Sequence, residues 1–297
     1  MTSREDATVA DTEGEDAVRD ARVARDLARL RATVTDEEAA AKWAQIAPLI
    51  DRLMERAGTK GEFTHRPDSA LAGDDKATDP YNTSHAFLQS LTSAIDHLHA
   101  AKSLVHGAGL LHLGAPATLA RSAIENAATA WWILAPRSRD ERVLRTLRWY
   151  SRNFRDQHTA LDGTPVGDTG RTLEDKLADI RAVAARRRGV NVAVAAGGYK
   201  MSTVITEHDQ TTVDSGSLFL WQLASGFAHG RTWAYLGALA QERHRAEAGI
   251  MSVRLTNTVQ VGLYPTLTAL HTVQDALRLW QSRAGMPLPD ARPRPRP

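Results

Sequence analysis

The sequence contains no cysteine. This absence excludes disulfide bonds, thiolate catalysis and cysteine-ligated zinc, and it fits the cytoplasmic location that we expect. Long apolar runs are also missing: the longest, Ala127–Ala135, is interrupted by Thr129 and falls well short of the roughly 18–20 residues that a membrane helix needs. The acidic N-terminus has no apolar stretch of the kind found in signal peptides. We therefore expect neither a membrane span nor a signal peptide.

Lysine is scarce, with 6 residues against 31 arginines. This bias indicates GC-rich coding, which is typical of many bacteria, and it weakens any inference from the arginine count to nucleic-acid binding.

Charge is unevenly distributed along the chain. Residues 1–20 hold seven acidic side chains against two arginines, a net charge of −5, so the rest of the chain carries +7 of the total of +2. That excess is moderate and below the charge density of a dedicated nucleic-acid binder.

Helical periodicity dominates the chain, and no strands alternate with the helical segments. Phe87, Leu91, Ile95 and Leu98, for example, recur at helical spacing. The pattern predicts an all-α fold, a multi-helix bundle with an N-terminal helical appendage and disordered tails. The segment 189–194 is open to either a short strand or a loop. The other expected helices cover residues 83–106, 116–135, 139–161, 172–188, 199–208, 214–240 and 254–283.

Composition divides the chain into five segments. The clearest boundary is residues 59–80, which are rich in Gly, Asp, Thr and Pro and are expected to form a linker. The expected segments are residues 1–34, acidic and largely disordered or loosely helical; 35–58, an amphipathic helix capped by Thr35 or Asp36; the linker 59–80; the helical bundle domain 81–284; and the Arg/Pro tail 285–297.

Two expected helices carry polar residues where a buried helix would carry none. The first, Ala117–Ala135, sets Arg121, Glu125 and Asn126 among apolar residues. Burying such groups costs several kcal/mol unless they are paired, so they are either structural partners or part of a site. We expect Glu125 to face Arg142 or His229 on another helix.

The second helix, Ser217–Leu236, places Gln222, Ser225, His229 and Thr232 on one stripe. Ser225 and His229 are four residues apart and close enough to interact. They either tie two helices together or line a binding site. A nucleophilic serine is disfavoured because no strand–turn–helix context surrounds it.

Basic side chains are concentrated in the expected helix Arg139–Leu161. Most such stripes are solvated faces, and a phosphate-binding surface is the alternative. The histidines His85, His99 and His106 share a stripe, but seven residues span roughly 10 Å of helix, too far for two of them to share one ion. We expect no metal and no cofactor.

The same helix ends in R-N-F-R-D-Q-H, which resembles the Arg-x(4–6)-His motif of HEPN-domain proteins, small helical bundles that include metal-independent ribonucleases. The resemblance implies Arg152 and His158 as a catalytic pair, Asn153 as an auxiliary polar group, and a homodimer. A broader likeness, over residues 81–240, is to a family of uncharacterised bacterial helical proteins, itself HEPN-like. It is carried by A-R-S-A-I-E-N-A-A-T-A-W-W-I-L, R-V-L-R-T-L-R-W-Y and L-A-S-G-F-A-H-G-R.

Two functions follow from these observations. The first is a HEPN-like protein of defence or toxin–antitoxin type that cleaves RNA or binds RNA or a nucleotide. In a nuclease, His158 would act as general base on a ribose 2′-hydroxyl and Arg152 would stabilise the phosphate. The second is a non-enzymatic helical binding or structural protein, in which Arg121, Glu125, Ser225 and His229 form a polar network.

Overall fold

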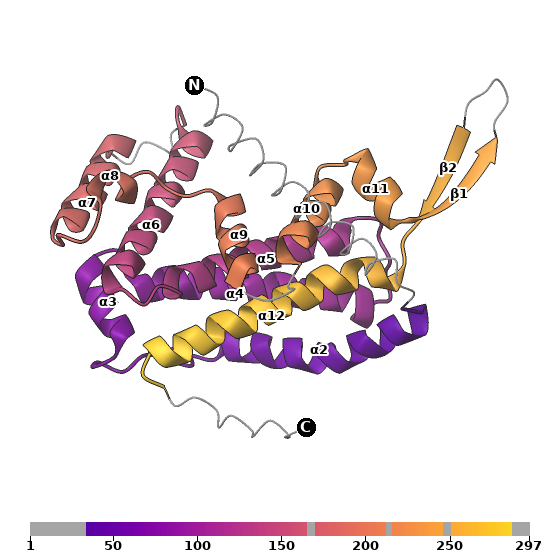
Figure 1. Cartoon of the computed structure of the whole chain (residues 1–297), viewed down its shortest axis with the longest axis horizontal. Coiled ribbons are helices and arrows are strands. Elements are labelled where there is room, and N and C mark those ends of the chain that lie inside the picture. Colours follow the sequence, from indigo (N-terminus) through magenta and orange to yellow (C-terminus); the bar gives the residue numbers. More distant parts are fainter. Residues whose placement is uncertain (1–33, 165–169, 212–215, 246–250, 287–297) are drawn as a thin grey trace, which may run out of the picture.

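A computed structural model describes residues 34–164, 170–211, 216–245 and 251–286. The described chain is mostly helical, with one two-stranded sheet, which confirms the prediction of an all-α bundle (Figure 1). Of the expected terminal segments 1–34 and 285–297, residues 1–33 and 287–297 lie outside these residues. The elements of the described chain are α2 (Asp36–Gly58), α3 (Ala70–Thr78), α4 (Thr83–Lys102), the π-helical turn η1 (Ser103–Gly107), α5 (Ala115–Leu134), α6 (Arg139–Leu161), α7 (Leu173–Ala185), α8 (Val192–Ala195), α9 (Met201–Thr211), α10 (Ser217–Ala228), α11 (Thr232–Ala238), β1 (Ala240–Arg245), β2 (Met251–Thr256) and α12 (Val259–Arg283).

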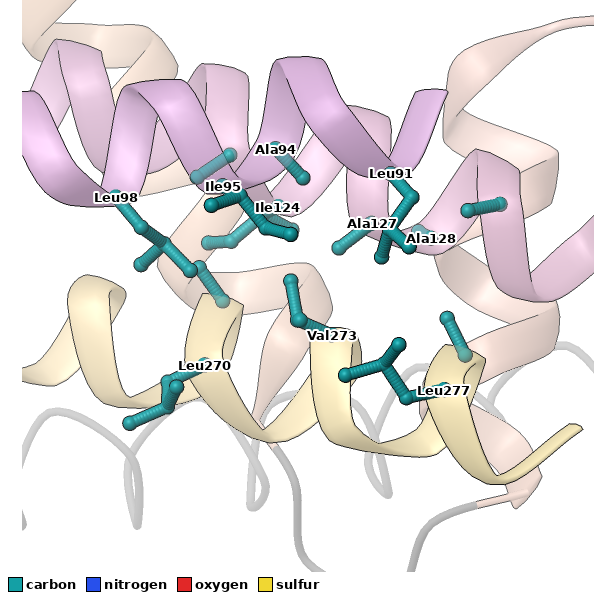
Figure 2. Packing of buried hydrophobic residues seen from close by; sticks show 14 of the residues in the cluster. Leu91, Ala94, Ile95, Leu98, Ile124, Ala127, Ala128, Leu270, Val273 and Leu277 are labelled. Carbon is teal, nitrogen blue, oxygen red and sulfur yellow. The ribbon is translucent and has the colours of Figure 1, made fainter. Parts of the chain in front are cut away.

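The core of the bundle lies between α4, α5 and α12, which run alongside one another (Figure 1). Figure 2 shows Ile95 of α4 next to Ile124 of α5, and Leu91 pointing toward Ala127, in the same cluster as Val273 of α12. Alanine fills many of the remaining contact positions on α5, including Ala123 and others that are fully buried. Such small side chains let neighbouring helices approach closely, because interaxial distance depends on the residues at the contact.

The helix expected over 35–58 forms as α2 and begins as predicted. The Thr35 hydroxyl accepts a hydrogen bond from the Glu38 backbone N–H, and the Glu38 carboxylate accepts one from the Thr35 N–H, so the two residues form a capping box. This helix is not an appendage, however, because Trp43 and Ile50 are buried in the main core. The Trp43 indole also donates to the carbonyl oxygen of Val259, 3.2 Å away, at the start of α12.

The expectation of a structureless linker at 59–80 is wrong, because the segment is folded onto the bundle. It contains α3, whose residue Leu71 is 1% exposed, and the ring of Phe63 packs edge-on against Trp280 with 5.3 Å between centroids. The backbone N–H of Arg66 donates to the Ala284 carbonyl at the end of α12. The polar composition of residues 59–80 did not predict this packing, because the residues that they contact lie far away in the sequence.

A buried ion pair joins α3 to α6. Arg142 donates through Nε and Nη2 to the two carboxylate oxygens of Asp74, at 2.6 and 2.9 Å, and both side chains are almost inaccessible to water. Arg142 Nη1 donates to the carbonyl oxygens of Pro136 and Arg137, while Arg139 also contacts Asp74 at 3.1 Å. The pair is therefore fully hydrogen-bonded, as a buried charge must be.

A second apolar cluster lies where α6 leaves the bundle and packs against α7 and α8 (Figure 1). Val143 and Leu147 of α6 meet Ile180 and Val183 of α7 in it. A short strand and a loop were the alternatives expected from the sequence for residues 189–194. No strand forms there, and the short helix α8 begins within the segment, at Val192.

The other end of the bundle departs from the expected helices. The chain turns between α10 and α11 at Gly230, whose φ is +62°, so the helix expected over 214–240 is broken. A Cβ at Gly226 would lie 2.6 Å from the Ala234 side chain, so glycine is what allows α11 to fold back onto α10.

Strands β1 and β2, which the sequence analysis did not expect, pair as an antiparallel hairpin that projects from the helices (Figure 1). The last helix accordingly begins at Val259 instead of Arg254. Val253 and Leu255 alternate with Ser252, Arg254 and Thr256, which is the signal that could have indicated a strand. Among the described helices, none is long and apolar enough to span a bilayer.

We expect Asp74→Ala to lower the free energy of unfolding by about 3–5 kcal/mol, because it leaves Arg142 buried without its partner. Chemical denaturation of the variant and the wild type measures this difference. Asp68→Ala is the matched control, since Asp68 and its partner Arg66 are both mostly exposed, and it should be nearly neutral. Equal stability of the two variants would contradict a structural role for the buried pair.

Candidate functional site

A polar network connects α5 to α10 at the position that the sequence singled out. Arg121 donates through Nε to the Ser225 hydroxyl, 2.8 Å away, and its Nη2 lies 2.8 Å from Glu125 Oε1. The Trp221 indole donates to the same Glu125 oxygen at 2.8 Å. The side chains of Arg121 and Glu125 remain 24% and 20% exposed, so the network faces solvent along one edge.

The local sequence explains this placement. Arg121 and Glu125 are four residues apart on α5 and so lie on one face of that helix. Trp221 and Ser225 have the same spacing on α10. The α5–α10 packing brings the two pairs together, which neither helix alone determines.

Asn126 and His229, also expected in this region, are not part of the network. Asn126 donates to the Ser122 carbonyl of its own helix at 2.9 Å. His229 is exposed at the C-terminal cap of α10, because that helix ends at Ala228. The hypothesis that Glu125 faces Arg142 or His229 is therefore wrong: Arg142 pairs with Asp74, and Glu125 pairs with Arg121 and Trp221.

Most arginines of α6 bind groups within the protein. Arg145 contacts the carboxylates of Glu141 and Glu207, both at 3.0 Å, and its guanidinium lies over the Trp132 ring. Arg148 donates to the Gly198 carbonyl at 2.7 Å, and its burial lowers the pKa of the guanidinium. Arg155 likewise donates to the Ala196 carbonyl at 2.8 Å. Carbonyl groups of the α8–α9 connection thus accept hydrogen bonds from arginines of the basic stripe, which the sequence analysis treated as either a solvated face or a phosphate-binding surface.

The structure places Arg152, Asn153 and His158 on the exposed C-terminal half of α6. Arg152 pairs with Asp156 at 2.8 Å, while His158 lies 3.8 Å from Asp162. The two side chains that the HEPN resemblance implies as a pair thus have separate partners on their own helix. Six residues apart, they lie about 9 Å apart along the helix axis and point in different directions.

Tyr199, in the connection between α8 and α9, lies near Trp132 of α5 and Arg152 of α6. Its ring lies 5.1 Å from that of Trp132, and a side chain at the neighbouring Gly198 would lie 3.5 Å from the Arg152 Cβ. Burial raises the pKa of the Tyr199 hydroxyl, while a hydrogen bond with Thr129 partly offsets this effect. Tyr199 therefore contacts α5 through Trp132 and lies near Arg152 of α6. No sequence pattern pointed to this residue as part of a site, because it lies in the short connection between α8 and α9.

A buried histidine on α9 is a further feature that sequence reasoning missed. His208 is 2% exposed, with its Nε2 3.4 Å from an Asp275 carboxylate oxygen on α12 and its ring edge-on to Trp131. Burial by itself would raise the pKa of Asp275, but the favourable interactions of the carboxylate with His208 and Arg278 outweigh it, so the net effect is a lowered pKa. Within the described ranges no group of three potential metal ligands comes together.

Glu125→Ala should lower the free energy of unfolding by about 1–3 kcal/mol, because Arg121 and Trp221 lose a partly buried acceptor. His229→Ala should leave it within about 0.5 kcal/mol of the wild-type value, since the side chain is exposed. Thermal melting of both variants beside the wild type tests the difference. If His229→Ala were as damaging as Glu125→Ala, the network described above would be incomplete.

Comparison with known proteins adds no family to this geometry. No protein-family model, curated protein or solved structure matches the chain. The HEPN resemblance therefore stays a prediction that depends on the residues quoted for it. Function has to be inferred from the arrangement of the described side chains.

Proposed function

We propose that this protein is a non-enzymatic helical binding protein whose ligand contacts the network of Arg121, Glu125, Trp221 and Ser225. The observation that supports this proposal is the combination of fixed geometry and partial exposure. Arg121 is held by two partners, yet about a quarter of its side chain faces solvent. A purely structural pair could be fully enclosed, as Asp74 and Arg142 are.

Unused hydrogen-bonding groups in the network indicate the class of ligand. The hydrogen bonds of the network use Arg121 Nε and Glu125 Oε1, so other atoms of both side chains keep hydrogen-bonding capacity, and the Ser225 hydroxyl accepts a bond but can still donate one. Donors and an acceptor thus lie side by side next to an indole ring. This combination suits a flat polar ligand that offers both donors and acceptors along one edge, such as a nucleobase.

We expect guanosine or adenosine 5′-monophosphate to bind the wild-type protein, as measured by isothermal titration calorimetry. Arg121→Gln should weaken binding by about tenfold or more, because a hydrogen bond to a charged group is lost. Arg254→Gln is the matched control, since Arg254 is 73% exposed on the hairpin. No heat of binding with either nucleotide would leave the network as a structural tie and contradict the proposal.

A HEPN-like ribonuclease of the defence or toxin–antitoxin type, acting as a homodimer, is the second candidate. It is favoured by the exposure of Arg152 and His158, whose side chains are 51% and 47% accessible and so remain open to RNA or to a second subunit. Asn153 is exposed beside Arg152. In this candidate, Arg152 and His158 from two subunits of the homodimer form the catalytic pair. His158 acts as general base, and Arg152 stabilises the phosphate.

RNA cleavage in EDTA tests the second candidate directly. If it holds, the wild type should cleave RNA without metal, and both Arg152→Ala and His158→Ala should reduce the rate by about a hundredfold or more. Arg171→Ala serves as control, because Arg171 forms a comparable exposed ion pair, with Asp179. Unchanged activity in the His158 variant, or no cleavage by the wild type, would eliminate the nuclease.

A further inference from the structure

Apolar side chains are exposed together at the end of the bundle that carries the hairpin. Of the seven large hydrophobic side chains that are exposed in the described chain, five lie there. We call this surface the apolar end and define it by these residues: Leu110, Leu111, Leu113, Trp233 and Leu236. Trp233 alone is 52% exposed, which is costly for so large an aromatic ring.

The loop and α11 that form the apolar end are in contact. A Cβ at Gly114, directly after the loop, would lie 3.1 Å from the Tyr235 hydroxyl of α11 and 3.5 Å from Phe227. The Asn257 side chain donates to the His112 carbonyl at 2.6 Å and so attaches the loop to the residues just before α12. The five exposed side chains therefore belong to one folded surface.

The N-terminal segment enters the bundle at this same end. The carbonyl oxygen of Val34, the first described residue, accepts a hydrogen bond from Gln260, three residues after the Asn257 that holds the loop. Figure 1 shows the start of α2, the start of α12 and the hairpin at one end of the molecule. Residues 1–33 thus lead away from a point beside the apolar end.

The sequence of that segment matches the surface in two ways. Val23, Leu27 and Leu30 are spaced so that they would share one face of a helix, with Val34 continuing the same stripe. A helix over residues 15–31 would be about 25 Å long. Further along, residues 1–20 carry a net charge of −5, whereas the described side chains of the 231–256 region include Arg231, Arg243 and Arg254 against Glu242 alone.

We propose that residues 1–33 dock onto the apolar end of their own chain. Val23, Leu27 and Leu30 cover the exposed leucines and Trp233, and the acidic residues that precede them lie against the arginines of the hairpin. The hydrophobic effect supplies the driving force, because both surfaces lose apolar area to water. The segment is thus an intramolecular cover for a surface that would otherwise be open to association.

The absence of cysteine makes the test clean, because spin labels can be attached at two introduced positions only. The probe is the full-length chain with Arg25→Cys and Ala108→Cys, and the measurement is the distance between the labels by pulsed electron paramagnetic resonance. Docking predicts one narrow distance distribution. Adding Leu27→Asp and Leu30→Asp should abolish it.

Ala21→Asp with Ala28→Asp is the matched control, since it adds the same charge to the opposite face of the segment and should keep the narrow distribution. An excess of unlabelled protein should also leave it unchanged. A broad distribution in every variant would overturn the proposal. A distance that disappears on mixing with unlabelled protein would also overturn it, because the segment would then occupy a second copy of the chain.

Discussion

Close packing against α5 is the constraint on which the rest of the structure depends. Alanine makes up half of its buried residues, so α4 and α12 can approach its backbone and form the main core. Helices α9 and α10 then cover parts of its remaining surface. Because α5 is enclosed on so many sides, each polar group on it needs a partner from a neighbouring helix or a route to solvent.

Charged side chains meet this need in two different ways. Arg142 and Asp74 are fully enclosed and fully hydrogen-bonded, which makes them a specific connection between α3 and α6. Arg121 and Glu125 are equally well oriented but stay partly open to water. The first arrangement fixes the fold, whereas the second leaves hydrogen-bonding groups in reach of a ligand. Burial, more than residue type, distinguishes a structural pair from a candidate site.

The two surfaces that we connect with function lie on different parts of the bundle. The network on α5 and α10 is polar and rigidly held, and it suits recognition of a small ligand through hydrogen bonds. The apolar end is formed by a loop and α11, and its exposed side chains offer apolar area without hydrogen-bonding groups. An isolated two-stranded hairpin is only marginally stable, so contacts at its base matter for its position.

The sequence by itself determined the helices with strong periodicity or clear caps, such as α2, whose N-cap is Thr35. It also identified Arg121 and Ser225 as polar residues of a candidate site. Those signals are local, because spacing and capping depend on residues within a turn or two. Only the tertiary structure decided that Arg142 meets Asp74, 68 residues away, and that residues 59–80 are packed instead of loose. Pairing between distant segments depends on the summed packing of the whole bundle, which no local pattern contains.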